Sequence, residues 1–222
     1  MNVLVVSAHH DDLELGCGAT VARLIEGGHS VTSLVMTHSG YRGPEGNEVR
    51  SRAVALREAQ RASAVLGYQL VTLNEDTLDI AESDRNVCEI LSVIRRQAID
   101  TVFTHWHGDS HPPHQRVHRM VLHAARHLPR VMGFAANWYL GEESFTPRLF
   151  VPASAAHWQR KLAALRCYED ELRRTDDRWM SYVEHVSAGY GLVVGAERAE
   201  GFMIYKYVWD IANAADSANG FA

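Results

Sequence analysis

The chain has 222 residues, of which 46% are hydrophobic and 22% are charged, a composition typical of a soluble globular protein. Its formal net charge of -5 at pH 7 argues against a general attraction to nucleic acid or to an anionic membrane surface. Three cysteines without a Cys-x-x-Cys pair argue against a disulfide framework. Because the sequence also shows no secretory signal pattern and no apolar stretch of roughly 18 residues, we expect a cytoplasmic protein that does not bind membranes.

Segments typical of strands and helices alternate through the first half of the chain. Short runs rich in valine, isoleucine and leucine predict buried strands at residues 3–7, 31–36, 70–73 and 100–104. Apolar residues at helical spacing predict helices at residues 18–26, 49–66, 84–97 and 112–127. Glycines end the first two helices, at Gly27 and Gly67, and Pro112 can begin the fourth. The glycine-rich residues 40–48 predict a surface loop.

The second half is less regular. It predicts strands at residues 131–139, 148–151 and 202–209, one long helix at residues 158–174, and a frayed tail at residues 213–222. Alternating strands and helices are typical of a three-layer α/β sandwich with a mainly parallel, Rossmann-like sheet. We therefore predict one such domain spanning residues 1–222.

Two polar segments follow predicted strands. Residues 8–14 read Ala-His-His-Asp-Asp-Leu-Glu, and residues 105–114 contain four histidines and Asp109. Ligands of parallel sheets bind outside the carboxyl ends of the strands, so both segments should contribute to one site at that edge. Charged groups beside a core need a partner, and a bound cation supplies one.

The residue types suit a zinc site. Neutral imidazole and carboxylate groups bind borderline divalent cations, zinc above all, although iron(II) or another divalent metal also fits such ligands. A catalytic zinc typically holds three protein ligands and lowers the pKa of a water in its open position toward about 7. Of two adjacent aspartates, one can bind the metal while the other accepts a proton from that water.

Two motifs in these segments carry a resemblance to a known family. His9-His10-Asp11-Asp12 resembles the Ala-His-Pro-Asp-Asp motif of the LmbE-like, or PIG-L-type, N-acetylglucosaminyl deacetylases. His111-Pro112-Pro113-His114 resembles their second motif, usually His-Pro-Asp-His, and Asp109 upstream also fits. Weaker similarities, at Glu58 with Leu66-Gly67, at Asp76 and at Ala199-Glu200-Gly201-Phe202, extend the resemblance from residue 3 to about residue 203.

The resemblance implies a role for each matching residue. Zinc would be held by His9, Asp12 and His114. Asp11 would be the general base that activates water, and His111 would polarise the amide oxygen. The looser parts of the match imply substrate contacts by Asp76, Arg50 and Arg52.

This sequence departs from the family pattern at two positions. His10 stands where the family has proline, and we count it among the expected substrate contacts. Pro113 replaces an aspartate that would lie beside the second-motif histidines. All three implied metal ligands are nevertheless present.

The resulting hypothesis is a zinc-dependent hydrolase that removes the N-acetyl group from an N-acetylated amino sugar, or from a conjugate of one. The alternatives are a metal-dependent phosphoesterase, which usually needs ligands for two metals, and a non-catalytic sugar-binding relic of the family. A dinucleotide site after Gly16-Cys17-Gly18 is disfavoured, because Val21 replaces the third glycine and the preceding acidic residues repel a pyrophosphate. The aromatic-rich C-terminal third is compatible with a homo-oligomer.

Overall fold

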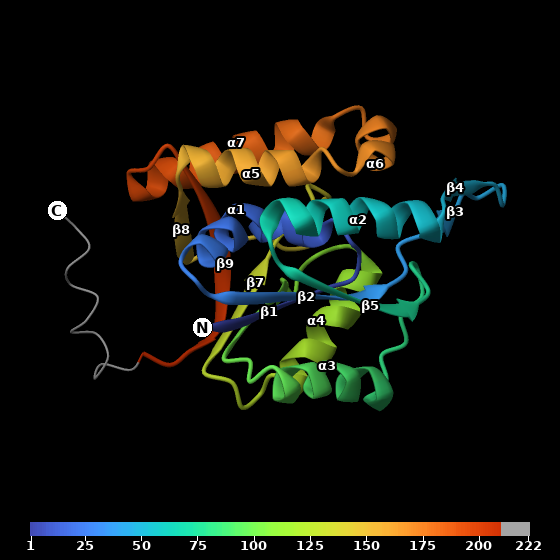
Figure 1. Ribbon diagram of the computed structural model, residues 1–222, viewed down its shortest axis with the longest axis horizontal. Coiled ribbons are helices and arrows are strands. Elements are labelled where there is room, and N and C mark those ends of the chain that lie inside the picture. Colours follow the sequence, from blue (N-terminus) through green and yellow to red (C-terminus); the bar gives the residue numbers. More distant parts are fainter. Residues whose placement is uncertain (210–222) are drawn as a thin grey trace.

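A computed structural model of the chain describes residues 1–209, and Figure 1 shows its arrangement. The centre is a seven-stranded sheet with the strand order β5-β2-β1-β6-β7-β9-β8. The strands of this sheet are β1 (Asn2–Ser7), β2 (Ser30–Thr37), β5 (Gln69–Glu75), β6 (Thr101–His105), β7 (Arg130–Phe134), β8 (Leu149–Ala153) and β9 (Arg198–Tyr207). The five strands from β5 to β7 are parallel, and β9 is antiparallel to both of its neighbours, β7 and β8, which confirms the predicted mainly parallel α/β sheet.

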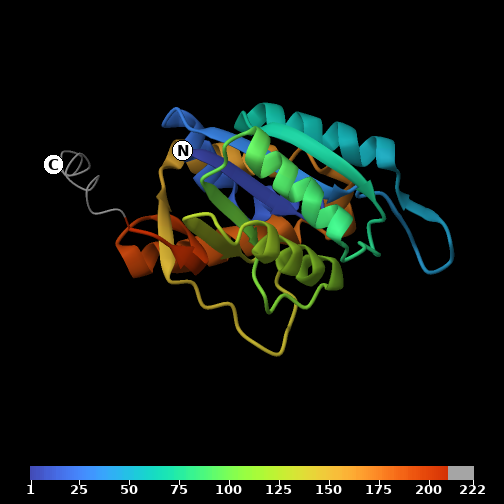
Figure 2. The same ribbon diagram turned by 90° about the horizontal axis from the view of Figure 1, so that it is seen from below.

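Seven helices cover the two faces of the sheet in the described part of the chain. They are α1 (Asp12–Glu26), α2 (Arg52–Leu66), α3 (Asp84–Arg96), α4 (Pro112–Ala124), α5 (Ala155–Leu165), α6 (Glu169–Arg174) and α7 (Arg178–Val194). In Figure 2, seen from below, the green α3 and yellow-green α4 lie in front of the sheet, and the remaining helices lie on its other side. None of the described helices is long and apolar enough to cross a membrane.

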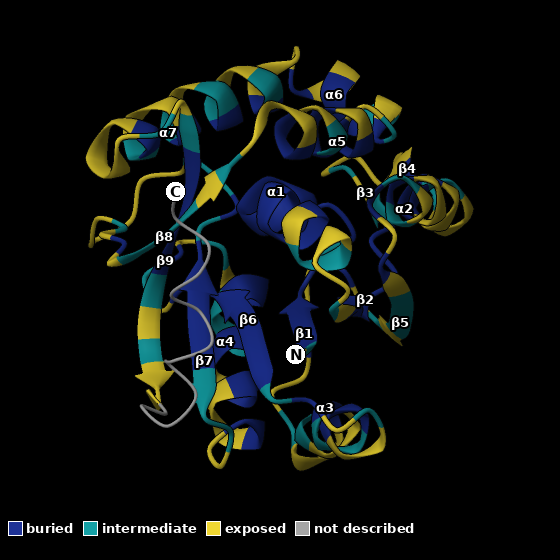
Figure 3. Ribbon diagram, turned by 60° about the vertical axis from the view of Figure 1, so that its left-hand side comes forward, coloured by how far each residue is buried: buried dark blue, intermediate teal, exposed yellow. Residues whose placement is uncertain are grey.

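The alternation of side chains along β1 builds two separate cores. Val3 and Val5 belong to the core under α1, α2, α5 and α7, whereas Leu4 and Val6 belong to the core under α3 and α4. A strand buried on both faces needs an uninterrupted apolar run, and Figure 3 shows β1, β6 and β7 as buried. The apolar runs used above to predict strands therefore reflect burial on both faces.

Helix α1 is buried from Asp12 to Ala22 because it lies between the sheet and α5. Gly16 allows this close packing, since a Cβ atom there would lie 2.1 Å from Cδ2 of Phe134 on β7. The helix is also broken at Cys17, whose φ of -147° and ψ of 21° are not helical. The prediction of a helix from residue 18 thus located only the segment after the break.

Two helix predictions in the second half need correction. The expected helix at residues 158–174 is two helices, α5 and α6, which are separated by a turn that ends at the fully buried Tyr168. Helix α7 was not predicted. Its buried face consists of Trp179, Val183, Ser187 and Gly191, and the last two are too small or too polar to give an apolar periodicity.

The predicted loop at residues 40–48 contains a short hairpin of β3 (Tyr41–Arg42) and β4 (Glu48–Arg50). The tail expected to be frayed, residues 213–222, lies outside the described residues.

The strand order places the switch point of the sheet at β1. The chain passes from β1 to β2 on one side, whereas β6 pairs with β1 on the other side. The segments that follow β1 and β6 therefore leave the same edge in different directions, and a crevice for ligands opens between them. Residues 8–14 and 105–114 meet at this edge as expected.

The tight contact of Gly16 gives a stability prediction. We expect Gly16→Ala to lower the free energy of unfolding by about 1–3 kcal/mol, because the Phe134 ring must move to admit the new methyl group. Gly189→Ala is the matched control: it lies in α7 with no atom within 4 Å of the position that its new methyl group would take, so it should stabilise the helix by about 0.5–1 kcal/mol. Urea unfolding curves measure both, and equal effects of the two substitutions would contradict the packing argument.

Candidate metal centre and active-site pocket

The first part of the site is the turn between β1 and α1. The backbone N–H of His9 donates to Oδ2 of Asp12 at 2.7 Å, which fixes the aspartate at the start of the helix. The Nε2 atom of His9 lies 3.1 Å from the carbonyl oxygen of Thr77. With Nε2 held by this carbonyl, Nδ1 of His9 is the ring nitrogen that faces the site.

The second part is His114 in the first turns of α4. Its Nε2 atom lies 3.2 Å from Nδ1 of His9 and 3.3 Å from Oδ1 of Asp12, and Oδ2 of Asp12 lies 3.5 Å from Nδ1 of His9. At zinc–nitrogen distances of about 2.0–2.1 Å, two ligands of a tetrahedral site are about 3.3 Å apart. The three side chains are therefore spaced as ligands of one tetrahedral ion, and their chemistry fits zinc.

The charges around His114 also fit a cation. Burial disfavours a positive charge on its ring, but the carboxylates of Asp12 and Asp109 outweigh burial and raise the pKa of His114 to about 10. Buried carboxylates therefore demand a positive charge at this point, and a divalent ion would take the place of the proton.

Asp109 holds several parts of the site together. Its Oδ2 atom accepts a hydrogen bond from Nδ1 of His114 at 2.9 Å, and its Oδ1 atom accepts the backbone N–H of His111 at 2.8 Å. The side-chain amide of Asn137 donates to both oxygens at 3.0 Å. A carboxylate on the far nitrogen of a ligand histidine fixes the ring orientation and increases its basicity.

His105 lies beneath the three ligands. Its ring stacks on that of His114 with centroids 3.8 Å apart, and its Nε2 atom is 3.2 Å from Oδ2 of Asp12. His105 with Asp12 and His114, and His9 with His111 and His114, are also close enough to hold an ion. Both sets share His114 with the first, so the described residues form one centre rather than two.

Asp11 points away from its neighbour Asp12. Its Oδ2 atom lies 3.3 Å from Nη1 of Arg50. The same Nη1 atom lies 3.7 Å from Oε1 of Glu171, and Nη2 of Arg50 lies 2.6 Å from Oε2 of Glu58. Burial raises the pKa of Asp11 to about 6, and the charge of Asp12 adds to the rise while Arg50 opposes it. Asp11 is thus a carboxylate whose basicity is well above the ordinary value, beside the metal centre but not in it.

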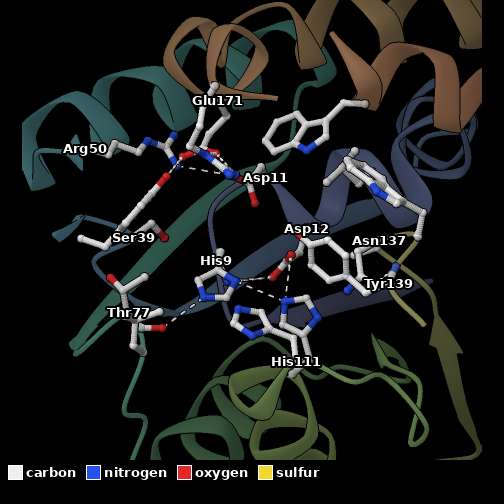
Figure 4. A pocket seen from close by; sticks show the side chains of 18 residues that line it. His9, Asp11, Asp12, Ser39, Arg50, Thr77, His111, Asn137, Tyr139 and Glu171 are labelled. Carbon is white, nitrogen blue, oxygen red and sulfur yellow. Dashed lines mark hydrogen bonds and ion pairs between the residues drawn. The ribbon is translucent and has the colours of Figure 1, made fainter. Parts of the chain in front are cut away.

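One cavity of about 220 Å³ is lined by the three candidate ligands and by Asp11, Arg50, His111 and Glu171. Figure 4 shows His9, Asp12 and His111 at its base, Asp11 with Arg50 and Glu171 on one wall, and Asn137 with Tyr139 opposite Ser39 and Thr77. Burial lowers the pKa of His111 to about 3, and the neighbouring His114 and His9 add to this effect. A neutral imidazole therefore faces the cavity at neutral pH.

Three of the expected substrate contacts lie elsewhere. His10 does not line the cavity: its ring is buried, with Nε2 3.1 Å from Oγ1 of Thr72 on β5. Residues 8–11 form a bend and a turn after β1, in which the ring of His9 faces His114 and the ring of His10 faces Thr72. We therefore withdraw His10 as a substrate contact. Asp76 and Arg52 line an adjoining hollow, which shares Tyr41, Arg50 and Leu78 with the main cavity.

Comparisons with known proteins identify the family of this chain. Residues 4–125 match the model of the PIG-L family, described as GlcNAc-PI de-N-acetylase. The uncharacterized deacetylase YaiS of Escherichia coli (strain K12) is 31% identical over 173 residues, which cover 74% of this chain and 88% of that protein. The chain belongs to the PIG-L family.

Further relatives support the classification of this PIG-L protein. The diacetylchitobiose deacetylase of Thermococcus kodakarensis is 27% identical over 225 residues, which cover 90% of this chain and 81% of that protein. The crystal structure of the conserved protein TT1542 from Thermus thermophilus has the same fold, with a TM-score of 0.79, 24% identity, and coverage of 96% of this chain and 99% of that one. The PIG-L chain is an N-deacetylase by class.

The cavity of this PIG-L protein also contains residues that the sequence did not reveal. Asn137 follows β7 and leaves the same sheet edge as the two motifs, but the predicted strand at residues 131–139 placed it inside a strand, whereas β7 ends at Phe134. Glu171 and Arg174 come from the short helix α6, and no motif or strand end marks them.

The contacts of Asp109 predict a large effect on metal binding. We expect Asp109→Asn to weaken zinc binding about 10- to 100-fold, because the His114 ring loses its anionic partner. Titration of the metal-free protein with zinc measures the affinity. Asp79→Asn, which removes a carboxylate paired with Arg116 at the surface, is the control and should leave the affinity unchanged. If both variants change the zinc affinity by the same small factor, Asp109 does not orient His114.

Proposed function

We propose that this protein is a zinc-dependent hydrolase that removes the N-acetyl group of an N-acetylated amino sugar or of a conjugate of one. The proposal is supported by three candidate metal ligands, a nearby carboxylate of raised basicity and a neutral imidazole around one cavity. These are the groups that hydrolysis of an amide requires, namely an electrophile, a base and a donor to the developing oxyanion.

His9, Asp12 and His114 would hold the metal, which polarises a carbonyl oxygen and makes water acidic when bound. Asp11 would accept the proton of the attacking water, because its carboxylate lies beside the ligands and keeps a raised pKa. His111 would stabilise the negative charge that develops on the amide oxygen. Its ring stacks on His9 with centroids 5.1 Å apart, so it lies against the metal centre.

Arg50 would act on the base and only indirectly on the substrate. The guanidinium is buried between Asp11, Glu58 and Glu171, so it holds Asp11 in place and limits the rise of its pKa. Asp76 and Arg52 would contact the more distant part of a conjugate, because they line the hollow that adjoins the cavity.

The phosphoesterase alternative is less well supported. Enzymes that hydrolyse phosphate esters commonly use two metal ions about 3.5–4 Å apart, and the candidate ligand sets in the described residues all share His114. The cavity also contains more carboxylates than arginines, which disfavours a phosphate dianion.

The substrate class is tested by supplying the protein with one equivalent of zinc and a panel of N-acetylhexosamine conjugates. Release of acetate, with an equal amount of free amine, is the expected result. The matching N-methylsulfonyl conjugates cannot be hydrolysed in this way and serve as the control. A zinc-loaded, folded protein that releases no acetate from any member of the panel would refute the proposal.

The division of roles between the two aspartates and the histidine gives a second test. We expect Asp11→Ala to retain one equivalent of zinc and to lower kcat by about 100-fold or more, because the base is lost while the ligands remain. His114→Ala should lose the metal, because it removes the ligand that all three candidate sets share. Metal analysis and kcat of both variants decide the assignment, and equal loss of zinc in the two would overturn it.

A further inference from the structure

A buried ion pair lies outside the cavity and has no part in the chemistry proposed above. Lys161 on α5 and Glu200 on β9 are 2% and 4% exposed, and Nζ of the lysine lies 2.6 Å from Oε1 of the glutamate. Placing two charges in a protein interior is costly unless their hydrogen bonds are satisfied, so the partners of this pair indicate its purpose.

The partners are three backbone groups of α1, on the two sides of its break at Cys17. In a continuous α-helix the N–H of Ala19 would donate to the carbonyl of Leu15. In α1 the carbonyl of Leu15 accepts from Nζ of Lys161 at 2.8 Å, and the N–H of Ala19 donates to Oε1 of Glu200 at 3.1 Å. The N–H of Thr20 donates to Oε2 of Glu200 at 2.7 Å. The lysine thus completes the first segment of the helix, and the glutamate caps the second.

The break between these segments lies directly behind the metal centre. It occurs at Cys17, five residues after Asp12 and two after Leu15, which lines the cavity. Gly16 is seated against Phe134 of β7, so the first segment is also held close to the sheet. The direction of this segment determines where the Asp11–Asp12 turn lies relative to His114 on α4.

We propose that Lys161 and Glu200 are positioning residues, which hold α1 broken at Cys17 and thereby keep Asp11 and Asp12 in register with His114. Both residues lie beyond residues 4–125, the part that matches the family model. The second half of the chain therefore contributes to the geometry of a metal centre whose candidate ligands all come from the first half. The part of the proposal that concerns Asp11 rests on the proposed function.

The test replaces both charges together, because a single substitution would leave the other charge buried and unpaired. In Lys161→Met/Glu200→Met the side-chain volumes are kept, and the freed backbone groups regain partners if the helix straightens. We expect a folded protein with zinc affinity weakened about tenfold or more, kcat lowered about tenfold or more and KM changed less than twofold. Hydrogen exchange of the metal-free protein should change in residues 12–20, which reports the helix without the metal or the substrate.

The control replaces the ion pair at the opposite end of the strands, Arg130→Met/Asp100→Leu. It should lower Tm but leave zinc affinity, kcat and exchange in α1 unchanged. If the Lys161/Glu200 double variant folds and keeps the zinc affinity and α1 exchange of the original protein, the pair is only structural and the proposal is wrong. If that variant does not fold, Lys161→Met/Glu200→Gln, which also removes both charges but keeps one acceptor oxygen at position 200, replaces it with the same readouts and the same criterion.

Failure of the proposed function can be distinguished from failure of the positioning role of Lys161 and Glu200. An original protein that releases no acetate would refute the deacetylase assignment, whereas zinc titration and hydrogen exchange would still decide whether the ion pair positions the turn.

Discussion

The structure depends on the concentration of buried carboxylates where β1 ends. Asp11, Asp12 and Asp109 are each less than one-tenth exposed, and each is an anion that the interior cannot tolerate without a positive partner. Two cationic centres divide this charge. Arg50 pairs with Asp11, and His114 lies between Asp12 and Asp109. Adjacent residues of one motif thereby acquire different environments, and the proposed division of roles between Asp12 as metal ligand and Asp11 as base rests on this difference.

The fold brings the two motifs together at one edge of the sheet, and side chains from distant elements fix the orientation of the site residues. Parallel strands place residues 9–12 and 105–114 at one edge, but the strand ends alone do not fix side-chain directions. The carboxylate of Asp109 fixes the His114 ring, and the Tyr168 hydroxyl donates to the carbonyl of His10 at 2.7 Å and lies 3.1 Å from Oε2 of the buried Glu14, which stabilises the turn. Burial raises the pKa of Glu14 to about 8, so this carboxyl group can be neutral among the buried groups of the turn.

The sequence was sufficient for the parts of the molecule that obey a strong periodicity or a strand-end rule. The parallel strands, most of the helices, and the closeness of His9, Asp12 and His114 all follow from apolar runs and from the residues directly after them. The sequence did not indicate which of two neighbouring side chains faces the cavity. His10 is a histidine within the first motif, yet its ring is directed to Thr72 on β5. It was also insufficient for Glu171, because a residue on a short helix carries no pattern that connects it to a distant strand.

The broken helix α1 shows why the second half of the chain is hard to interpret from motifs alone. A glycine at position 16, a non-helical residue at Cys17 and a buried lysine at position 161 are each ordinary in the sequence. At the break in α1 they form a network of one ion pair and three bonds to the backbone. Such a network is costly when incomplete and rigid when every member is satisfied. The network stiffens α1, the helix that carries Asp12. Burying Lys161 and Glu200 costs free energy, and we infer that this cost is tolerated because a fixed backbone keeps the candidate metal ligands in place.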